Sequence, residues 1–188
     1  DILLILDEIQ CCMGRTGKMF TYQHYGIKPD ILTMAKALGC GVPVGAFAAK
    51  SRVADAMCPG DHGTTYGGNP LATAAVCKVF EIFQEKGIVQ HVNEIAPYLK
   101  EKLEALKDKY NTIIKDIRGM GLMLGMELSV PAGNIVKEAL ENNLILISAG
   151  SNIIRFVPPL IIEKEHIDAM YKILDGILNN QANFGNIL

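Results

Sequence analysis

The sequence of 188 residues predicts an α/β fold in two parts: residues 1–92 as a portion of a large, mostly parallel sheet, and residues 93–188 as a small α+β domain. Three observations predict it. The apolar run Ile2–Leu6 ends at Asp7 and is typical of a strand buried on both faces of a parallel sheet. Strand-like and helix-like segments alternate over the first part. After about Gly87 the composition changes, and the sequence takes on a Lys- and Glu-rich amphipathic pattern.

In the first part, short apolar segments over residues 31–34 and 44–49 predict two further strands, with a glycine-rich turn between them. A short helix is expected over residues 52–57. Asn69-Pro70 can open a helix, and apolar residues at helical spacing from Leu71 to Phe83 predict one there.

In the second part, the apolar stripe of residues 93–109 predicts an amphipathic helix. Strands are expected over 113–118, 122–128, 144–148 and 153–157. Further helices are expected over 135–142 and 164–178. The polar tail 179–188 is expected to be loose.

Bulk properties exclude several classes of protein. A net charge of −2 gives no electrostatic footprint for nucleic acid. No apolar run is long enough for a transmembrane helix, and the start lacks the basic region of a signal peptide. The five cysteines match no zinc spacing, so free thiols and no metal site are expected. A chain that opens on Asp inside a strand suggests a piece of a longer protein.

Asp7 stands where chemistry is expected, because open α/β sheets bind ligands at the carboxyl ends of their strands. A P-loop ATPase uses an aspartate there to hold Mg²⁺. An enzyme that depends on pyridoxal 5′-phosphate (PLP) uses one opposite the ring nitrogen of the cofactor. The segment Gly14–Met19 has too few residues between its glycines for a phosphate loop, and Met replaces the required hydroxyl. An ATPase would therefore need a phosphate loop outside this sequence.

A PLP enzyme needs a lysine for a Schiff base, an acid at the ring nitrogen, donors for the phosphate and a cation for the substrate carboxylate. Lys36 follows a short apolar strand and is the candidate lysine, although an exposed loop lysine would look the same. Asp7 is the candidate acid, or else a carboxylate satisfied by backbone N–H groups. Gln10 could donate to the ring oxygen and Ile9 could pack on the ring face, whereas Glu8 is expected to be structural.

The two remaining requirements have candidates further along the chain. The loop GTTYGGNP, which includes Thr65, supplies hydroxyls and N–H groups just before a helix, and helix N-termini favour phosphate. Arg155 lies in an apolar strand, and its planar guanidinium can bind a carboxylate in two-point fashion. The alternatives are an ordinary glycine-rich loop and a structural ion pair.

Taken together, the segments ILDEIQ, MGRTGKMF, IKPDILTMAKALGCGVPVGAF, GDHGTTYGGNPLA, IRGMGLMLGMEL and NIIRFVPPLII resemble the class III aminotransferases, which have PLP fold type I. The resemblance covers about residues 2–178. It implies that Lys36 is the Schiff-base lysine, that Asp7 and Gln10 contact the ring nitrogen and ring hydroxyl, and that Thr65 binds the phosphate in the neighbouring subunit. It also implies that Arg155 binds the α-carboxylate of the substrate.

The same resemblance implies a cytoplasmic homodimer with shared active sites, which moves the terminal amine of N-acetylornithine to 2-oxoglutarate in arginine biosynthesis. Ornithine, succinylornithine and 4-aminobutyrate stay open as donors, as does a regulator of the same fold without catalysis. Cys11-Cys12 departs from the family pattern, in which a small residue or Cys is followed by Gly. Because the family's chains are about twice as long, the 188 residues alone are expected to be the C-terminal half and inactive.

Overall fold

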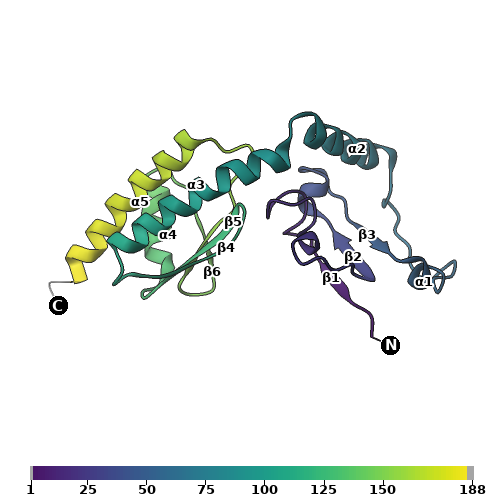
Figure 1. Ribbon diagram of the computed structural model, residues 1–188, viewed down its shortest axis with the longest axis horizontal. Helices are drawn as coiled ribbons and strands as arrows, with labels where there is room; N and C mark the ends of the chain where they lie inside the picture. The colour runs from purple at the N-terminus through teal and green to yellow at the C-terminus, as the bar shows by residue number, and fades with distance from the viewer. Residues whose placement is uncertain (1, 186–188) are drawn as a thin grey trace. The chain divides into compact units, whose positions relative to one another are not determined.

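The structure is a computed structural model, which describes the backbone of residues 2–185 and the side chains of residues 2–182. The chain divides into two compact units, residues 1–90 and 91–188 (Figure 1). The boundary predicted from the sequence lies two residues later, after residue 92. The assignment of the first unit to a large PLP-binding domain and of the second to a small C-terminal domain stays a prediction.

The first unit contains a three-stranded sheet in the order β1-β2-β3, formed by β1 (Ile5–Asp7), β2 (Ile31–Met34) and β3 (Ala46–Ala49). Strands β1 and β2 are parallel, whereas β2 and β3 are antiparallel. The helical segments are η1 (Thr21–His24), η2 (Lys36–Leu38), α1 (Ser51–Ala54) and α2 (Pro70–Glu85). Helix α2 begins where predicted, because the Asn69 side chain accepts a hydrogen bond from the N–H of Ala72 and Pro70 occupies the first turn.

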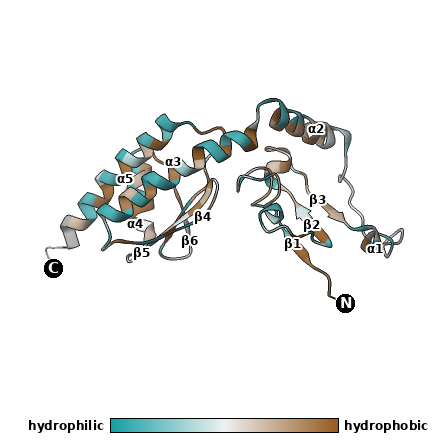
Figure 2. Ribbon diagram, in the orientation of Figure 1, coloured by the Kyte–Doolittle hydropathy of each residue, from teal (hydrophilic) through white to brown (hydrophobic). Residues whose placement is uncertain are grey.

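The apolar run that leads into β1 is not buried among the described residues. Leu3 is 45%, Leu4 40% and Ile5 57% exposed, so the prediction of a strand buried on both faces is wrong for this chain. Among the described residues β1 pairs with β2 alone, and no other described element covers these side chains. Figure 2 shows this hydrophobic segment at the N-terminal end. Its composition favours burial that the described residues do not provide.

The core of the first unit is small and is supplemented by polar anchors. Cys12, Met13, Leu38 and Val79 form its cluster of buried apolar residues. Glu8 is only 2% exposed, and its carboxylate accepts hydrogen bonds from the backbone N–H groups of Thr21 (2.6 Å) and Tyr22 (2.7 Å). These are the free donors of the first turn of η1, where a carboxylate is favourable. The expectation that Glu8 is structural is therefore confirmed.

The second unit contains an antiparallel sheet in the order β4-β5-β7-β6. Its strands are β4 (Ile114–Met120), β5 (Met123–Leu128), β6 (Ile147–Ala149) and β7 (Ile153–Phe156), and its helices are α3 (Ile88–Lys109), α4 (Ala132–Glu141) and α5 (Lys164–Gly185). The first three residues of α3 belong to the first unit.

Helix α5 is longer than predicted. The expected loose tail is wrong over residues 179–185, which continue the helix, while residues 186–188 lie outside the described residues. The extension has a packing reason, since Ala182 packs against the core. The side-chain amides of Asn180 and Gln181 also donate to the carboxylate of Glu138 on α4.

The second unit buries one face of its sheet under three helices. Residues along β5 alternate between half-buried and buried, with Leu124, Met126 and Leu128 facing the core. Leu103 of α3, together with residues of α4 and α5, completes a large apolar cluster. The opposite face of the sheet carries the other residues of each strand, and Arg155 is among them.

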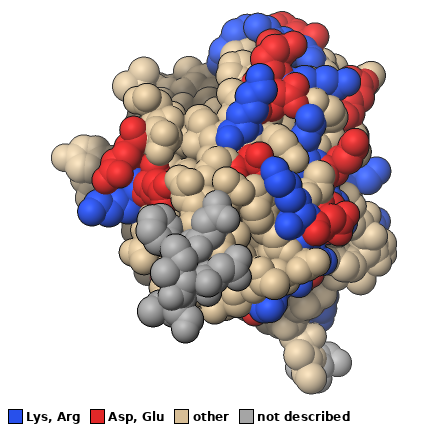
Figure 3. Space-filling view, turned by 90° about the vertical axis from the view of Figure 1, so that its left-hand side faces the viewer, with Lys and Arg blue, Asp and Glu red and all other residues tan. Residues whose placement is uncertain are grey.

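Charged side chains on α3 and α5 pair with each other on the surface of the second unit. Asp168 accepts from the hydroxyl of Tyr98 and pairs with Lys102, with each contact 2.7 Å long. Figure 3 shows acidic and basic side chains interleaved on the face it displays, with no large patch of one sign. No helix among the described residues is long and apolar enough to cross a membrane.

Candidate cofactor site

Asp7 ends β1 with one carboxylate oxygen held in place. Its Oδ1 accepts the N–H of Ile9 at 2.9 Å and the hydroxyl of Thr33 at 3.3 Å. Thr33 is the residue directly opposite Asp7 in the parallel register of β1 and β2. Among the described residues no hydrogen bond reaches the other oxygen, and Asp7 is exposed. The carboxylate is therefore oriented by its own sheet and keeps an acceptor for an incoming group.

Lys36 lies three residues after Thr33, as the first residue of η2 just beyond β2, and has a strained conformation. Its φ of 46° is in the left-handed region, which non-glycine residues seldom adopt. Such strain costs about 1–3 kcal/mol and clusters at functional sites. Gly39 allows the turn that follows, because an added Cβ there would collide with the carbonyl oxygen of Val42. The Lys36 side chain is exposed and makes no ion pair among the described residues.

Ile9 and Gln10 follow Asp7 in a tight turn and are half-buried. Within the described part of the chain, the Gln10 side chain has no hydrogen-bond partner, so its amide is available to a ligand. The neighbouring Cys12 is buried, and burial together with the Glu8 carboxylate raises the pKa of its thiol to about 11. Cys12 is thus a core residue, and all five cysteines are free, as expected from the sequence.

Thr65 lies in the exposed loop that precedes α2. Thr64 and Asn69 shape this loop: the Oγ1 of Thr64 accepts the N–H of Gly67, and the side-chain amide of Asn69 donates to the carbonyl of Tyr66. No hydrogen bond among the described residues joins Thr65 to Asp7 or Lys36. The structure of one chain therefore leaves the predicted role of Thr65 as a prediction.

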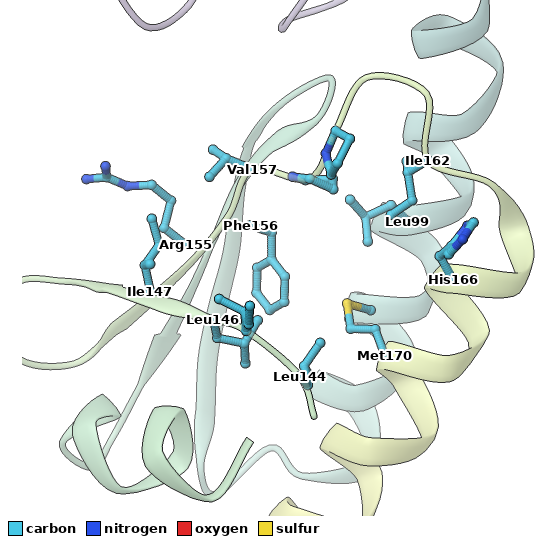
Figure 4. Close-up of a pocket in the computed structure, with 13 residues that line it drawn as sticks. Leu99, Leu144, Leu146, Ile147, Arg155, Phe156, Val157, Ile162, His166 and Met170 are labelled. Carbon is cyan, nitrogen blue, oxygen red and sulfur yellow. The ribbon is translucent and has the colours of Figure 1, made fainter. Parts of the chain in front are cut away.

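Arg155 belongs to the second unit and lies on the face of β7 that points away from the apolar core. Figure 4 shows its guanidinium directed away from Phe156 and Leu146, which face a cavity of about 400 Å³. Among the described residues the Arg155 side chain has no hydrogen bond and no ion pair. Both the predicted carboxylate-binding role and the alternative of a structural ion pair stay predictions.

The residues at the ends of β1 and β2 fit PLP. A carboxylate with a free oxygen suits the protonated ring nitrogen, and an exposed primary amine just beyond the next strand suits the aldehyde. Sequence reasoning assigned no role to Thr33, although the parallel pairing of the two strands would have placed it opposite Asp7. No group of His, Cys, Asp or Glu among the described residues could hold a metal ion.

The segment Gly14–Met19 does not form a phosphate-binding loop. It follows β1 as a series of turns in which Gly14 and Gly17 have positive φ angles, and the next element is the short η1. A P-loop leads from a strand directly into an α-helix, whose N–H groups hold the phosphate. The side-chain hydroxyl of Thr16 is instead within hydrogen-bond distance of Thr21 and His24.

Comparison with known proteins finds the family that the sequence motifs resemble. Residues 1–178 match the family described as Aminotransferase class-III. The acetylornithine aminotransferase of Methanocaldococcus jannaschii is 51% identical over 177 residues, which cover 94% of this chain and 44% of that enzyme. The acetylornithine aminotransferase of Bacillus subtilis is 46% identical over 182 residues, covering 96% and 46%. The chain spans less than half the length of these relatives.

Solved structures agree on the fold. An S-selective transaminase from Arthrobacter sp. with alanine bound superposes with a TM-score of 0.92 at 30% identity, over 98% of this chain and 46% of that one. The acetylornithine aminotransferase from Elizabethkingia anophelis gives a TM-score of 0.89 at 32% identity, over 95% and 46%. The predicted fold, a part of PLP fold type I, is confirmed. This chain belongs to the class III aminotransferase family.

Proposed function

We propose that the full-length protein carrying this chain is a PLP-dependent aminotransferase that moves the terminal amine of N-acetylornithine to 2-oxoglutarate, as a step of arginine biosynthesis in the cytoplasm. The observation that carries the proposal is the placement of Asp7 and Lys36 at the ends of two adjacent parallel strands, with Lys36 strained. The choice of donor is supported by relatives named acetylornithine aminotransferases at 46–51% identity.

Lys36 has two tasks in this proposal. Its amine holds the cofactor covalently between turnovers. With PLP and the donor bound, the Lys36 amine would accept the proton from the reacting carbon of the substrate as general base and would deliver it to the cofactor carbon as general acid. The left-handed backbone at Lys36 fixes where the side chain leaves the strand end, and the amine carries no competing ion pair among the described residues.

Asp7, Ile9 and Gln10 hold and tune the ring. When bound, PLP supplies an electron sink for the electrons released at the reacting carbon. Asp7 keeps the ring nitrogen protonated by accepting its hydrogen bond on the oxygen that Ile9 and Thr33 leave free. Gln10 donates to the ring oxygen, and Ile9 covers one ring face.

Thr65 and Arg155 are the proposed partners of two anionic groups, the cofactor phosphate and the substrate α-carboxylate. We infer that Thr65 binds the cofactor phosphate of the neighbouring subunit in a homodimer, since its loop is exposed. We infer that Arg155 binds the α-carboxylate of the donor and of 2-oxoglutarate, because a two-point hydrogen-bonded pair matches its free guanidinium.

The test is turnover by the PLP-loaded, full-length protein with N-acetylornithine, ornithine, succinylornithine and 4-aminobutyrate, each with 2-oxoglutarate. Lys36→Ala should lower turnover by at least about 10²–10⁴-fold, since the proton carrier is lost. Lys18→Ala, which removes another exposed lysine of the same unit, should leave turnover unchanged. Full activity of Lys36→Ala would remove Lys36 from this role. Turnover with a donor other than N-acetylornithine would keep the mechanism and replace the substrate.

A further inference from the structure

One row of the sheet in the second unit brings two arginines to either side of a glycine. In the strand register, Arg118 of β4 is opposite Gly125 of β5, and Gly125 is opposite Arg155 of β7. Directly opposed residues in neighbouring strands point to the same face of a sheet. With strands about 4.8 Å apart, the two arginine backbones are separated by roughly 10 Å, and only Gly125 lies between them.

This row is on the face of the sheet that the helices do not cover. The neighbours of these residues along the strands, Ile117, Leu124 and Phe156, are buried on the other face. The two arginines differ in their partners. The guanidinium of Arg118 is paired with Glu127 and Asp116, whereas that of Arg155 has no partner among the described residues. An anion that arrives at this row therefore finds one satisfied cation and one free cation.

Gly125 is not required by the local backbone. Its φ is not in the left-handed region. An added Cβ would meet the Cγ2 of Ile153 at 3.4 Å and the carbonyl oxygen of Arg118 at 3.8 Å, which are ordinary contacts. Glycine inside a strand weakens the strand, and it often marks a place where a ligand or another backbone approaches closely. A ligand that approaches here would meet the guanidinium of Arg155, since Arg155 is opposite Gly125 in the strand register.

We propose that Gly125 is a specificity-determining residue for carboxylate-bearing substrates. Its bare backbone keeps open the space beside the Arg155 guanidinium, so that a carboxylate can lie flat against it and accept two hydrogen bonds. A branched side chain at this position would project between Arg118 and Arg155. It would block the path by which a carboxylate reaches the guanidinium of Arg155. This inference rests on the proposed role of Arg155 as the carboxylate-binding residue.

The experiment compares Gly125→Ala, Gly125→Val and Arg155→Gln in the PLP-loaded, full-length protein. Each is assayed with N-acetylornithine and with N-acetylputrescine, the same donor without its carboxylate. Gly125→Val should raise KM for N-acetylornithine about 10–100-fold, because the substrate carboxylate loses its charge-assisted hydrogen bonds. The value of kcat should change less than about threefold. Gly125→Ala should have a smaller effect in the same direction. Neither should change kcat/KM for N-acetylputrescine.

Ala149→Val is the matched control. Ala149 is opposite Ile153 and therefore faces the same side of the sheet one row away, so this variant adds similar bulk without covering Arg155. Its KM for N-acetylornithine should stay within about twofold of the parent value, which corresponds to less than 1 kcal/mol. Valine also suits a strand, so the melting temperature of Gly125→Val should not fall.

The outcomes distinguish a failure of the inference about Gly125 from a failure of the proposed role of Arg155. If Arg155→Gln leaves KM for N-acetylornithine unchanged, the proposed role of Arg155 is wrong. If Arg155→Gln raises KM but Gly125→Val does not, Arg155 keeps its role and the inference about Gly125 is overturned. A fall in kcat/KM for both donors with Gly125→Val would show general distortion of the sheet and would also overturn it.

Discussion

The two units of this chain differ in how many apolar residues their described parts bury. The first unit carries Asp7, Gln10 and Lys36, but its buried apolar cluster is built around four residues. The second unit packs three helices on one sheet face and has a far larger apolar cluster. Burial of apolar surface is the dominant favourable term in folding. Among the described residues, polar anchors hold the segments around the candidate cofactor residues beside a small apolar cluster, whereas the second unit packs around a large one.

The polar anchors of the first unit hold the segments around the candidate site. Glu8 directly follows Asp7, and its carboxylate binds the first N–H groups of η1. Asp30, just before β2, accepts the N–H of Leu4 at 2.9 Å and pairs with Lys50 at 3.1 Å and Arg52 at 2.7 Å. Both carboxylates are buried, and a buried charge that loses its partners is costly.

The largest effect on stability is expected from truncating the same residue type in the two cores. Leu103 is fully buried in the second unit, and Leu38 is 3% exposed in the first. Leu103→Ala should destabilise its unit by about 3–5 kcal/mol and Leu38→Ala by about 2–3 kcal/mol, since the described residues place fewer buried apolar neighbours around Leu38. Hydrogen exchange in the full-length protein, read separately for amides of the two units, measures both changes. An equal or larger loss for Leu38→Ala would contradict the comparison.

A smaller effect is expected from pH through Asp30. The N–H of Leu4, then the side chains of Arg52 and Lys50, hold the pKa of this carboxyl well below its usual range. Asp30 therefore stabilises the first unit above the ordinary carboxyl pKa of about 4, and this contribution is lost as the pH falls from there toward the lowered value. The protection of the β1 and β2 amides from hydrogen exchange, relative to the intrinsic exchange rate at each pH, should fall over that range.

Asp30→Asn isolates this contribution. The variant should exchange faster in β1 and β2 at neutral pH and should lose that part of the acid dependence. Asp55→Asn, at an exposed aspartate of the same unit, should behave like the parent protein. An acid dependence of these amides that is identical in Asp30→Asn and in the parent would show that another group is responsible.

The smallest effect concerns the thiols of the first unit. Cys12 is buried with a pKa of about 11, whereas Cys40, Cys58 and Cys77 are exposed. The thiolate is the reactive form. Brief treatment with iodoacetamide at neutral pH, followed by peptide mass spectrometry, should modify the exposed cysteines and spare Cys12. Modification of Cys12 at the rate of Cys40 would mean that the small core opens readily.

Periodicity and capping signals predicted most elements, and the errors have physical causes. Asn69-Pro70 marked the start of α2 correctly because the cap is a local interaction. The burial of β1 could not be read from ILLIL, since composition reports a preference for burial and not the presence of neighbours. Residues 179–185 were predicted as tail because their polar composition hides two contacts with Glu138, which is distant in sequence.

The candidate site was predictable in its residues but not in its geometry. Lys36, Asp7 and Arg155 could be named from strand ends and from the resemblance to the class III aminotransferases. The strain at Lys36 and the hydrogen bond from Thr33 to Asp7 depend on backbone angles and on strand register. The row of Arg118, Gly125 and Arg155 arises from pairing across three strands, which no local pattern encodes.

The central claim is that Lys36 binds PLP covalently in the unit with the smaller core. The most direct measurement is borohydride reduction of the PLP-loaded, full-length protein, which converts the covalent link into a stable amine, followed by peptide mass spectrometry. We predict one pyridoxyl group per chain, on Lys36, and none on Lys18, Lys28 or Lys50. A pyridoxyl group on another lysine, or on none, would contradict the claim.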